Sequence, residues 1–130
     1  MKRRYKISNI INFWDCTVEI DPDFVIEHLS MSNGAFTTMD IMKEMIGFWM
    51  GGEGRLDDND GDVTKTFLQQ LGREIFIILS NSNWNVNGVI AEFENREGWA
   101  AMNGSFGIKI IDTDVVEFSH SDFEVEEVES

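Results

Sequence analysis

The first twenty residues alternate apolar and polar side chains and predict two β-strands. The first run ends at Ser8-Asn9, a pair that favours a turn. The stretch from Phe13 to Ile20 then places large apolar or β-branched residues between polar ones. Two such runs in succession predict an N-terminal β-hairpin.

The second of these strands contains an adjacent aromatic pair and the cysteine. Phe13 and Trp14 are neighbours, so on a strand their side chains point to opposite faces. One of them is therefore a candidate exposed anchor for a partner. Cys16 is expected to be buried, protonated and unreactive.

Apolar residues at intervals of three and four predict helices in the middle of the chain. Asp21-Pro22 is a helix-start signal, because Asp accepts hydrogen bonds from free helix N–H groups and Pro lacks an N–H. The inward face of this short helix is expected to hold Phe24, Val25, His28 and Leu29.

Two further helices are expected after Asn33-Gly34. One is capped by Thr37 or Thr38 and ends at Gly51-Gly52, with Met39, Met42, Ile46 and Trp49 on its apolar face. The other is capped by Asp60 or Asp62 and continues to about Leu79; its last part, Ile75–Leu79, is apolar all round and is either a buried helix end or a strand. Residues 53–62, between them, are predicted to form a polar, acidic loop.

The C-terminal part of the chain predicts strands over Val89–Phe93, Phe106–Ile111 and Val115–Phe118. The order of strands, helices and strands is typical of an α+β domain. We expect an N-terminal hairpin, two to three helices and a C-terminal antiparallel meander, in one sheet with the helices packed on one face. This single domain is predicted over residues 1–123, followed by an acidic tail over 124–130.

The charge of the chain is strongly negative and unevenly distributed. The sequence has 24 Asp and Glu against 10 Lys and Arg, a net charge of −14 on 130 residues. Four basic residues lie in the first six positions, and no Lys or Arg occurs after Lys109. Such a surface repels nucleic acid and attracts basic proteins. The single cysteine and the lack of a signal or membrane-spanning segment predict a cytoplasmic protein.

No catalytic, metal or cofactor motif accompanies this charge. If Gly61 is placed at the sixth position of a calcium-binding loop, Leu56 falls first and Phe67 twelfth, where carboxylates are required. A loose divalent site at Asp58, Asp60 and Asp62 stays an alternative to a solvated loop that caps a helix. The two histidines lack motif partners, and the glycines match no phosphate-binding loop. We therefore predict no catalytic residues, no metal and no cofactor.

Short motifs between residues 40 and 123 carry a family resemblance: Phe48-Trp49, Arg55-Leu56, Gly61-Asp62-Val63, Glu74, Glu97-Gly98-Trp99, Gly104-Ser105 and Gly107-Ile108. In these motifs the chain resembles an uncharacterised family of small domains that bacteria, phages and prophages encode. The resemblance implies a bacterial or phage setting and transfers no catalytic residues. In size and charge alone, the chain is also similar to acidic phage inhibitors of host defence, including DNA-mimic and anti-CRISPR proteins.

These features predict a non-enzymatic protein that binds a basic partner. We expect a phage- or prophage-type inhibitor of a nucleic-acid-handling or defence protein of the host, which acts by charge mimicry of nucleic acid. It is expected to bind neither nucleic acid nor a membrane directly. The candidate contacts are Asp57, Asp58, Asp60 and Asp62 in the loop, with Asp112, Asp114, Glu117, Asp122, Glu124, Glu126 and Glu127 near the C-terminus.

Two other function classes stay open. A small ligand-binding or hydrolytic domain would need a pocket, lined by Trp84, Trp99 and carboxylates. A self-associating assembly protein would need an exposed apolar patch, for which Met39, Met42, Met45 and Met50 are the candidates.

Overall fold

A three-stranded antiparallel sheet forms one layer of the protein. The computed structural model describes residues 1–9, 11, 14–30, 34–82, 84–114 and 125–127. Strand β1 (Arg3–Asn9) pairs with β2 (Trp14–Ile20) as the predicted hairpin, and β2 pairs with β3 (Ile108–Thr113). The strand order is β1-β2-β3, so β2 is central.

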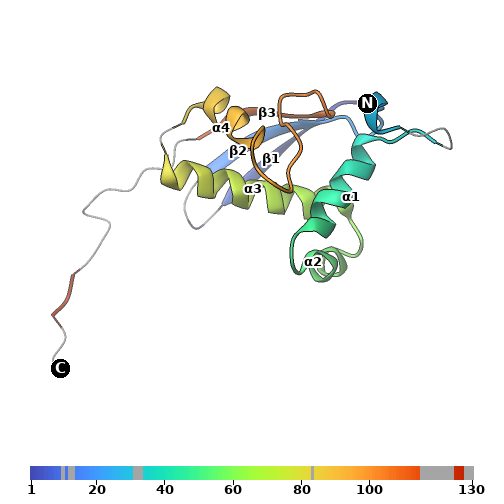
Figure 1. The fold of residues 1–130 in the computed structure, drawn as a ribbon. Coiled ribbons are helices and arrows are strands. Elements are labelled where there is room, and N and C mark those ends of the chain that lie inside the picture. The colour runs from blue at the N-terminus through green and yellow to red at the C-terminus, as the bar shows by residue number, and fades with distance from the viewer. Residues whose placement is uncertain (10, 12–13, 31–33, 83, 115–124, 128–130) are drawn as a thin grey trace.

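The helices cover one face of this sheet, as the sequence predicted. They are α1 (Thr38–Phe48), α2 (Gly52–Asp58), α3 (Val63–Asn81) and α4 (Val86–Phe93), with a short 3-10 helix, η1 (Glu27–Leu29). Figure 1 shows α3 running along the sheet, with α1 and α2 gathered near its first turn. The α+β class is confirmed.

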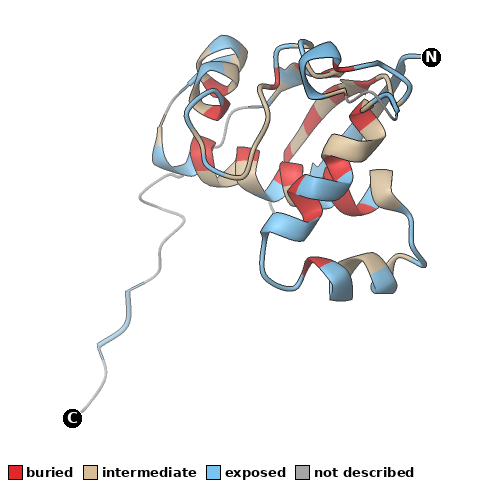
Figure 2. Cartoon of the chain, turned by 45° about the vertical axis from the view of Figure 1, so that its right-hand side comes forward, coloured by how far each residue is buried: buried red, intermediate tan, exposed pale blue. Residues whose placement is uncertain are grey.

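The core lies between β2 and α3. Alternate residues of β2 are buried, with Val18 fully inaccessible and the Cys16 side chain 1% exposed. On α3 the buried side chains recur at helical spacing: Phe67, Leu71, Ile75 and Ile78. Burial of each such side chain stabilises the fold by roughly 1.5–3 kcal/mol. The buried positions of α3 in Figure 2 mark the face that it turns towards the strands.

Side-chain caps set the starts of the main helices. Asp62 accepts a hydrogen bond from the Lys65 backbone N–H at 3.0 Å and begins α3, as predicted. At α1 the Thr37 backbone N–H donates to the Asp40 carboxylate at 2.9 Å, and this bond lowers the pKa of Asp40. Both bonds satisfy N–H groups that a helix end leaves free.

The predicted helix after Asp21-Pro22 is wrong. The backbone of residues 24–26 is extended and bonds instead to residues 36–38, through Ile26 N–H to Phe36 C=O and Thr38 N–H to Phe24 C=O. As a result Ile26 is the buried residue of this segment, while Phe24, Val25, His28 and Leu29 are exposed.

The predicted strand over Val89–Phe93 is also wrong, because this segment is helix α4. The Asn85 side chain accepts from the Gly88 N–H at 2.9 Å and starts the helix before the predicted Asn87-Gly88 turn. Val89 and Phe93, four residues apart, are the two fully buried positions.

Three other element boundaries differ from the sequence prediction. Residues 53–58 of the expected loop lie in α2, which begins at Gly52, and α1 ends at Phe48, before Trp49. The last predicted strand within the described residues begins at Ile108 rather than Phe106. Gly107 precedes it with a φ of +80° and accepts the Asp21 N–H, so the chain turns there. The predicted strand Val115–Phe118 lies outside the described residues.

Gly72 fixes how closely α3 approaches β1. A Cβ atom at Gly72 would lie 2.6 Å from Ile7 Cγ2, whereas one at Gly54 in α2 would meet nothing within 4 Å. We expect Gly72→Ala to lower the free energy of unfolding by about 1–3 kcal/mol through overpacking. Gly54→Ala, the control, should raise it by roughly 0.5–1 kcal/mol, because alanine favours helix. Urea denaturation measures the free energy of unfolding of both variants. Equal changes in the two would show that stability does not depend on the close approach of α3 to β1 at Gly72.

Burial of Cys16 creates a pH dependence at alkaline pH. Desolvation, with smaller contributions from Asp15 and Asp114, raises the pKa of the Cys16 thiol from 9.0 to about 12. The unfolded chain therefore loses this proton at lower pH than the folded chain, so the free energy of unfolding should fall as pH rises from 9 towards 12. Urea denaturation of wild type and Cys16→Ala over this range tests the idea. Parallel pH profiles for the two proteins would contradict it.

Candidate functional site

Four predicted contact residues lie together in a surface segment, residues 57–62, which we call the acidic segment. Asp57 and Asp58 end α2, Asp60 follows, and Asp62 caps α3; all four are exposed. None of the four carboxylates forms an ion pair with any described residue. Their charge is therefore open to a partner. Figure 2 shows α2 buried at its start, half-buried in its middle and exposed at its end, where Asp57 and Asp58 lie.

Hydrogen bonds hold the acidic segment in one shape. The Asn59 side-chain amide donates to Thr66 Oγ1 at 3.0 Å and to Gln69 Oε1 at 2.8 Å, which ties the segment to α3. Asp60 and Gly61 follow with φ of 55° and 81°, the left-handed conformation of a tight helix ending. The four carboxylates are thus presented by an ordered backbone.

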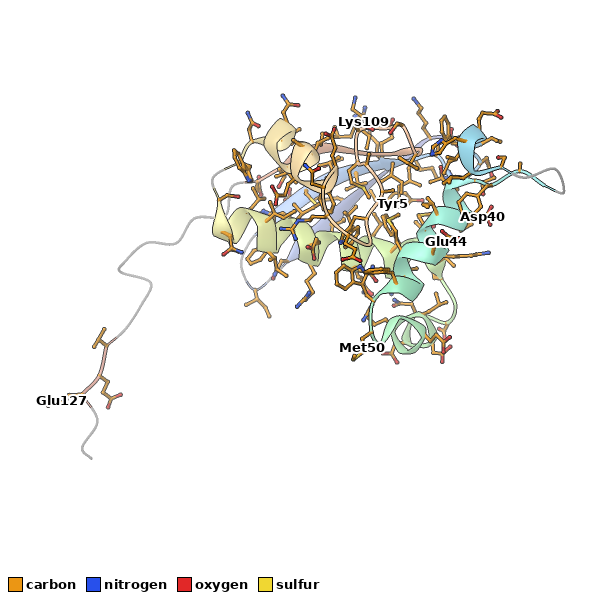
Figure 3. The ribbon with its side chains drawn as sticks, in the orientation of Figure 1. Tyr5, Asp40, Glu44, Met50, Lys109 and Glu127 are labelled. Carbon is orange, nitrogen blue, oxygen red and sulfur yellow. The ribbon has the colours of Figure 1, made fainter. Side chains whose placement is uncertain are left out.

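The C-terminal candidates do not join this group. Asp112 and Asp114 lie at the far end of β3, where the Trp14 indole N–H donates to the Asp114 backbone carbonyl. Trp14 in turn packs on Phe76 of α3, fourteen residues beyond the Asp62 cap, a separation of ~20 Å along a helix. Glu126 and Glu127 are exposed, and Figure 3 draws Glu127 apart from the helices. Glu117, Asp122 and Glu124 lie outside the described residues.

The N-terminal basic residues are largely matched by acidic residues of the hairpin and the turn after it. Arg4 Nε lies 3.1 Å from Glu19, Lys6 Nζ 3.4 Å from Asp15, and the Met1 ammonium 3.0 Å from Asp21. These exposed pairs each contribute little to stability. They do cancel charge on the open face of the sheet, so the excess of carboxylates falls on other surfaces.

A second site is a pocket of about 550 Å³ between α2, the second to fourth turns of α3, the connection from α1 to α2 and the loop after α4. Its walls include two indole rings and two guanidinium groups, and we call it the tryptophan pocket. It is lined by Trp49, Met50, Arg55, Gln69, Gln70, Arg73, Glu74 and Trp99. Several residues of the family motifs, Trp49, Arg55, Glu74 and Trp99, meet here although they are distant in sequence.

Aromatic contacts and one ion pair build the pocket walls. Trp99 packs on Phe93 and Phe67 with centroid distances of 5.3 and 6.3 Å, and its ring centre lies 6.3 Å from that of Trp49. On the α3 side Glu74 accepts from Arg96 at 2.7 Å and ties the loop before Trp99 to the helix.

The structure corrects three of the sequence-based expectations about exposed residues. Trp14 is buried at 4% exposure, so it is no surface anchor, and Phe13 lies outside the described residues. Trp84 packs on Gly88 and does not line the pocket with Trp99. Met42 and Met45 are buried and only Met50 is almost fully exposed, so the expected methionine patch is not formed.

No cluster of side chains suited to a metal ion occurs among the described residues. Within the same part of the chain, no helix has the length and apolar composition needed to span a bilayer.

Comparison with known proteins assigns this chain to a family. Residues 16–126 match the family model described as "Protein of unknown function (DUF2528)". The chain belongs to the DUF2528 family. The match confirms the predicted resemblance and extends it to β2.

Two DUF2528 relatives give the family its setting. The chain is 32% identical over 114 residues to the protein ea10 of Escherichia phage lambda, with 84% of each chain covered. The lambda prophage-derived protein ea10 of Escherichia coli O6:H1 matches with the same identity and coverage. No solved structure matches this DUF2528 chain significantly.

The Glu74–Arg96 pair should be the strongest ion pair at the pocket. The Glu74 side chain is 13% exposed and lies 2.7 Å from Arg96, whereas Glu92 is 41% exposed and lies 3.6 Å from the same arginine. We expect Glu74→Gln to lower the free energy of unfolding by about 1–2 kcal/mol, because it removes the nearer and less exposed of the two counter-charges of a half-buried guanidinium. Glu92→Gln should cost no more than about 0.5 kcal/mol. Urea denaturation compares them, and equal costs would contradict this assignment.

Proposed function

We propose that this chain is a non-enzymatic phage-type protein that binds the basic surface of a host nucleic-acid-handling or defence protein through its acidic segment. The carboxylates of Asp57, Asp58, Asp60 and Asp62 stand in for the phosphates that such a surface normally contacts. The observation that carries the proposal is the presence of four exposed carboxylates, without cationic partners among the described residues, on one ordered six-residue segment.

The local energetics of α2 support a role in binding. Asp57 and Asp58 occupy the C-terminal end of this helix, where the helix dipole disfavours negative charge. Gly52 and Gly54 further weaken a helix of only seven residues. A segment that departs from the local rules of helix stability is typical of a functional surface.

The surface around the acidic segment also favours a basic partner. Figure 3 shows Asp40 and Glu44 on α1, at the end of the molecule that also holds α2. Arg55, the basic residue of α2, donates instead to the Met50 carbonyl at 2.9 Å and the Gln70 amide oxygen at 2.9 Å. Arg55 keeps its charge, but residues 52–65 carry five carboxylates, on Glu53 and the four aspartates of the acidic segment, against two cations, Arg55 and Lys65. The net charge of this segment is therefore negative, which favours fast, salt-sensitive association with a basic protein.

The relatives supply the context for this proposal. One is encoded by phage lambda and the other derives from a lambda prophage, so a bacterial host protein is a reasonable partner. Compared with the sequence prediction, the proposed surface is smaller, because Asp112 and Asp114 lie near the other end of α3.

The test is a triple variant, Asp57→Asn, Asp58→Asn and Asp60→Asn, in affinity capture from a bacterial lysate at low and moderate salt. We expect wild type to retain a nucleic-acid-binding protein that added DNA displaces, and the triple variant to lose it. Asparagine tolerates the left-handed backbone at Asp60, and removing charge from the end of α2 should leave thermal stability unchanged or slightly higher.

A double variant at the other end of the sheet is the matched control. Asp112→Asn with Asp114→Asn also removes exposed carboxylates and should leave retention unchanged. Retention that survives the triple variant, or that both variants weaken in proportion to the charge removed, would rule out a specific acidic segment.

A further inference from the structure

The tryptophan pocket has a charge opposite to that of the protein around it. Arg55 and Arg73 both line it, and its one carboxylate, Glu74, is already paired with Arg96. In a chain with a net charge of −14, this is a local excess of positive charge. Such a pocket favours an anion over a cation.

Unused hydrogen-bond donors gather at and beside the same pocket. Among the described residues, the buried side-chain polar atoms without a hydrogen-bond partner are Arg55 Nε, Arg96 Nε and Trp99 Nε1. All are donors, and burial of an unpaired donor costs about 1–3 kcal/mol. Arg73 adds an exposed guanidinium for which no described residue forms an ion pair. The region therefore has more donors than acceptors.

Aromatic surface is the second component of the pocket. The Trp49 and Trp99 ring planes are inclined at 43°, and Trp49 is 38% exposed. Exposed indole surface in a concave site is a favourable contact for a planar ring. The volume of about 550 Å³ lies within the range of small-molecule sites.

We propose that the tryptophan pocket binds a small planar aromatic molecule that carries an anionic group. The ring packs against Trp49 and Trp99, and the anionic group accepts hydrogen bonds from Arg73. Nucleoside monophosphates and aromatic carboxylates share this chemistry. The site is distinct from the acidic segment, which faces a basic partner, so it adds an activity to the proposed function and does not depend on it.

Isothermal titration calorimetry on the full chain tests the proposal with probes that separate ring from charge. The probes are AMP, adenosine, inorganic phosphate, indole-3-acetate and tryptamine. We expect at least one of the aromatic anions, AMP or indole-3-acetate, to bind about tenfold or more tightly than the uncharged, cationic or ring-free probes. The preference between AMP and indole-3-acetate identifies which of the two ligand classes fits.

Variants assign the binding to this pocket. Arg73→Gln should weaken the anionic probe about tenfold, while leaving the fold intact because Arg73 is exposed. Lys65→Gln is the matched control: it removes the same charge from an exposed position of α3 that does not line the pocket. Trp49→Leu should weaken every aromatic probe.

Three results would overturn the proposal: no binding of either aromatic anion, equal binding of tryptamine, or equal effects of Arg73→Gln and Lys65→Gln. The triple variant of the acidic segment should bind the anionic probe normally. If wild type captures no partner but binds the anionic probe, the proposed function fails and this proposal stands. If wild type captures a partner but does not bind the probe, this proposal fails and the proposed function stands.

Discussion

The structure depends on the packing of α3 against one face of a three-stranded sheet. A sheet this small cannot bury its apolar face alone, and the fully buried Phe67, Leu71 and Ile75 of α3 cover it. This contact also positions both candidate sites, because the acidic segment leads into the first turn of α3 and the tryptophan pocket uses the next turns, at Gln69, Gln70, Arg73 and Glu74. Close approach at Gly72 then holds β1 against the middle of the helix.

Charge is divided among three surfaces with different consequences. On the open face of the hairpin, the N-terminal cations lie beside Asp15 and Glu19 and are largely neutralised. At the α2 end, exposed carboxylates stand without cationic partners among the described residues, and the tryptophan pocket beside α2 and α3 carries guanidinium groups. The net charge alone does not give this distribution, since the same −14 could have been spread evenly over the surface. This arrangement is the basis of the two proposals, a basic protein at the acidic segment and an anionic ring in the tryptophan pocket.

Local signals made much of the fold predictable. The hairpin, the helix that begins at Thr38 and the long helix capped by Asp62 follow from alternation, capping and apolar spacing, all of which act over a few residues. The failures have long-range causes: residues 24–26 bond to residues 36–38, and Val89 to Phe93 is a β-favouring run that packs as a helix. The sequence suggested a pocket lined by Trp84 and Trp99, whereas the structure pairs Trp99 with Trp49. These two residues meet only through the packing of α1, α3 and the loop after α4. Two local signals could have identified α4: the Asn85 cap and the helical spacing of Val86, Val89, Ile90 and Phe93.

The central claim is that partner recognition is confined to the α2 end of the molecule. Amide hydrogen exchange, measured on the chain alone and bound to a protein recovered in the proposed affinity capture, tests this most directly. The account predicts slower exchange over residues 52–62 on binding, with no change over β3 and Asp114. Protection centred on β3, or spread evenly over every acidic surface, would contradict it.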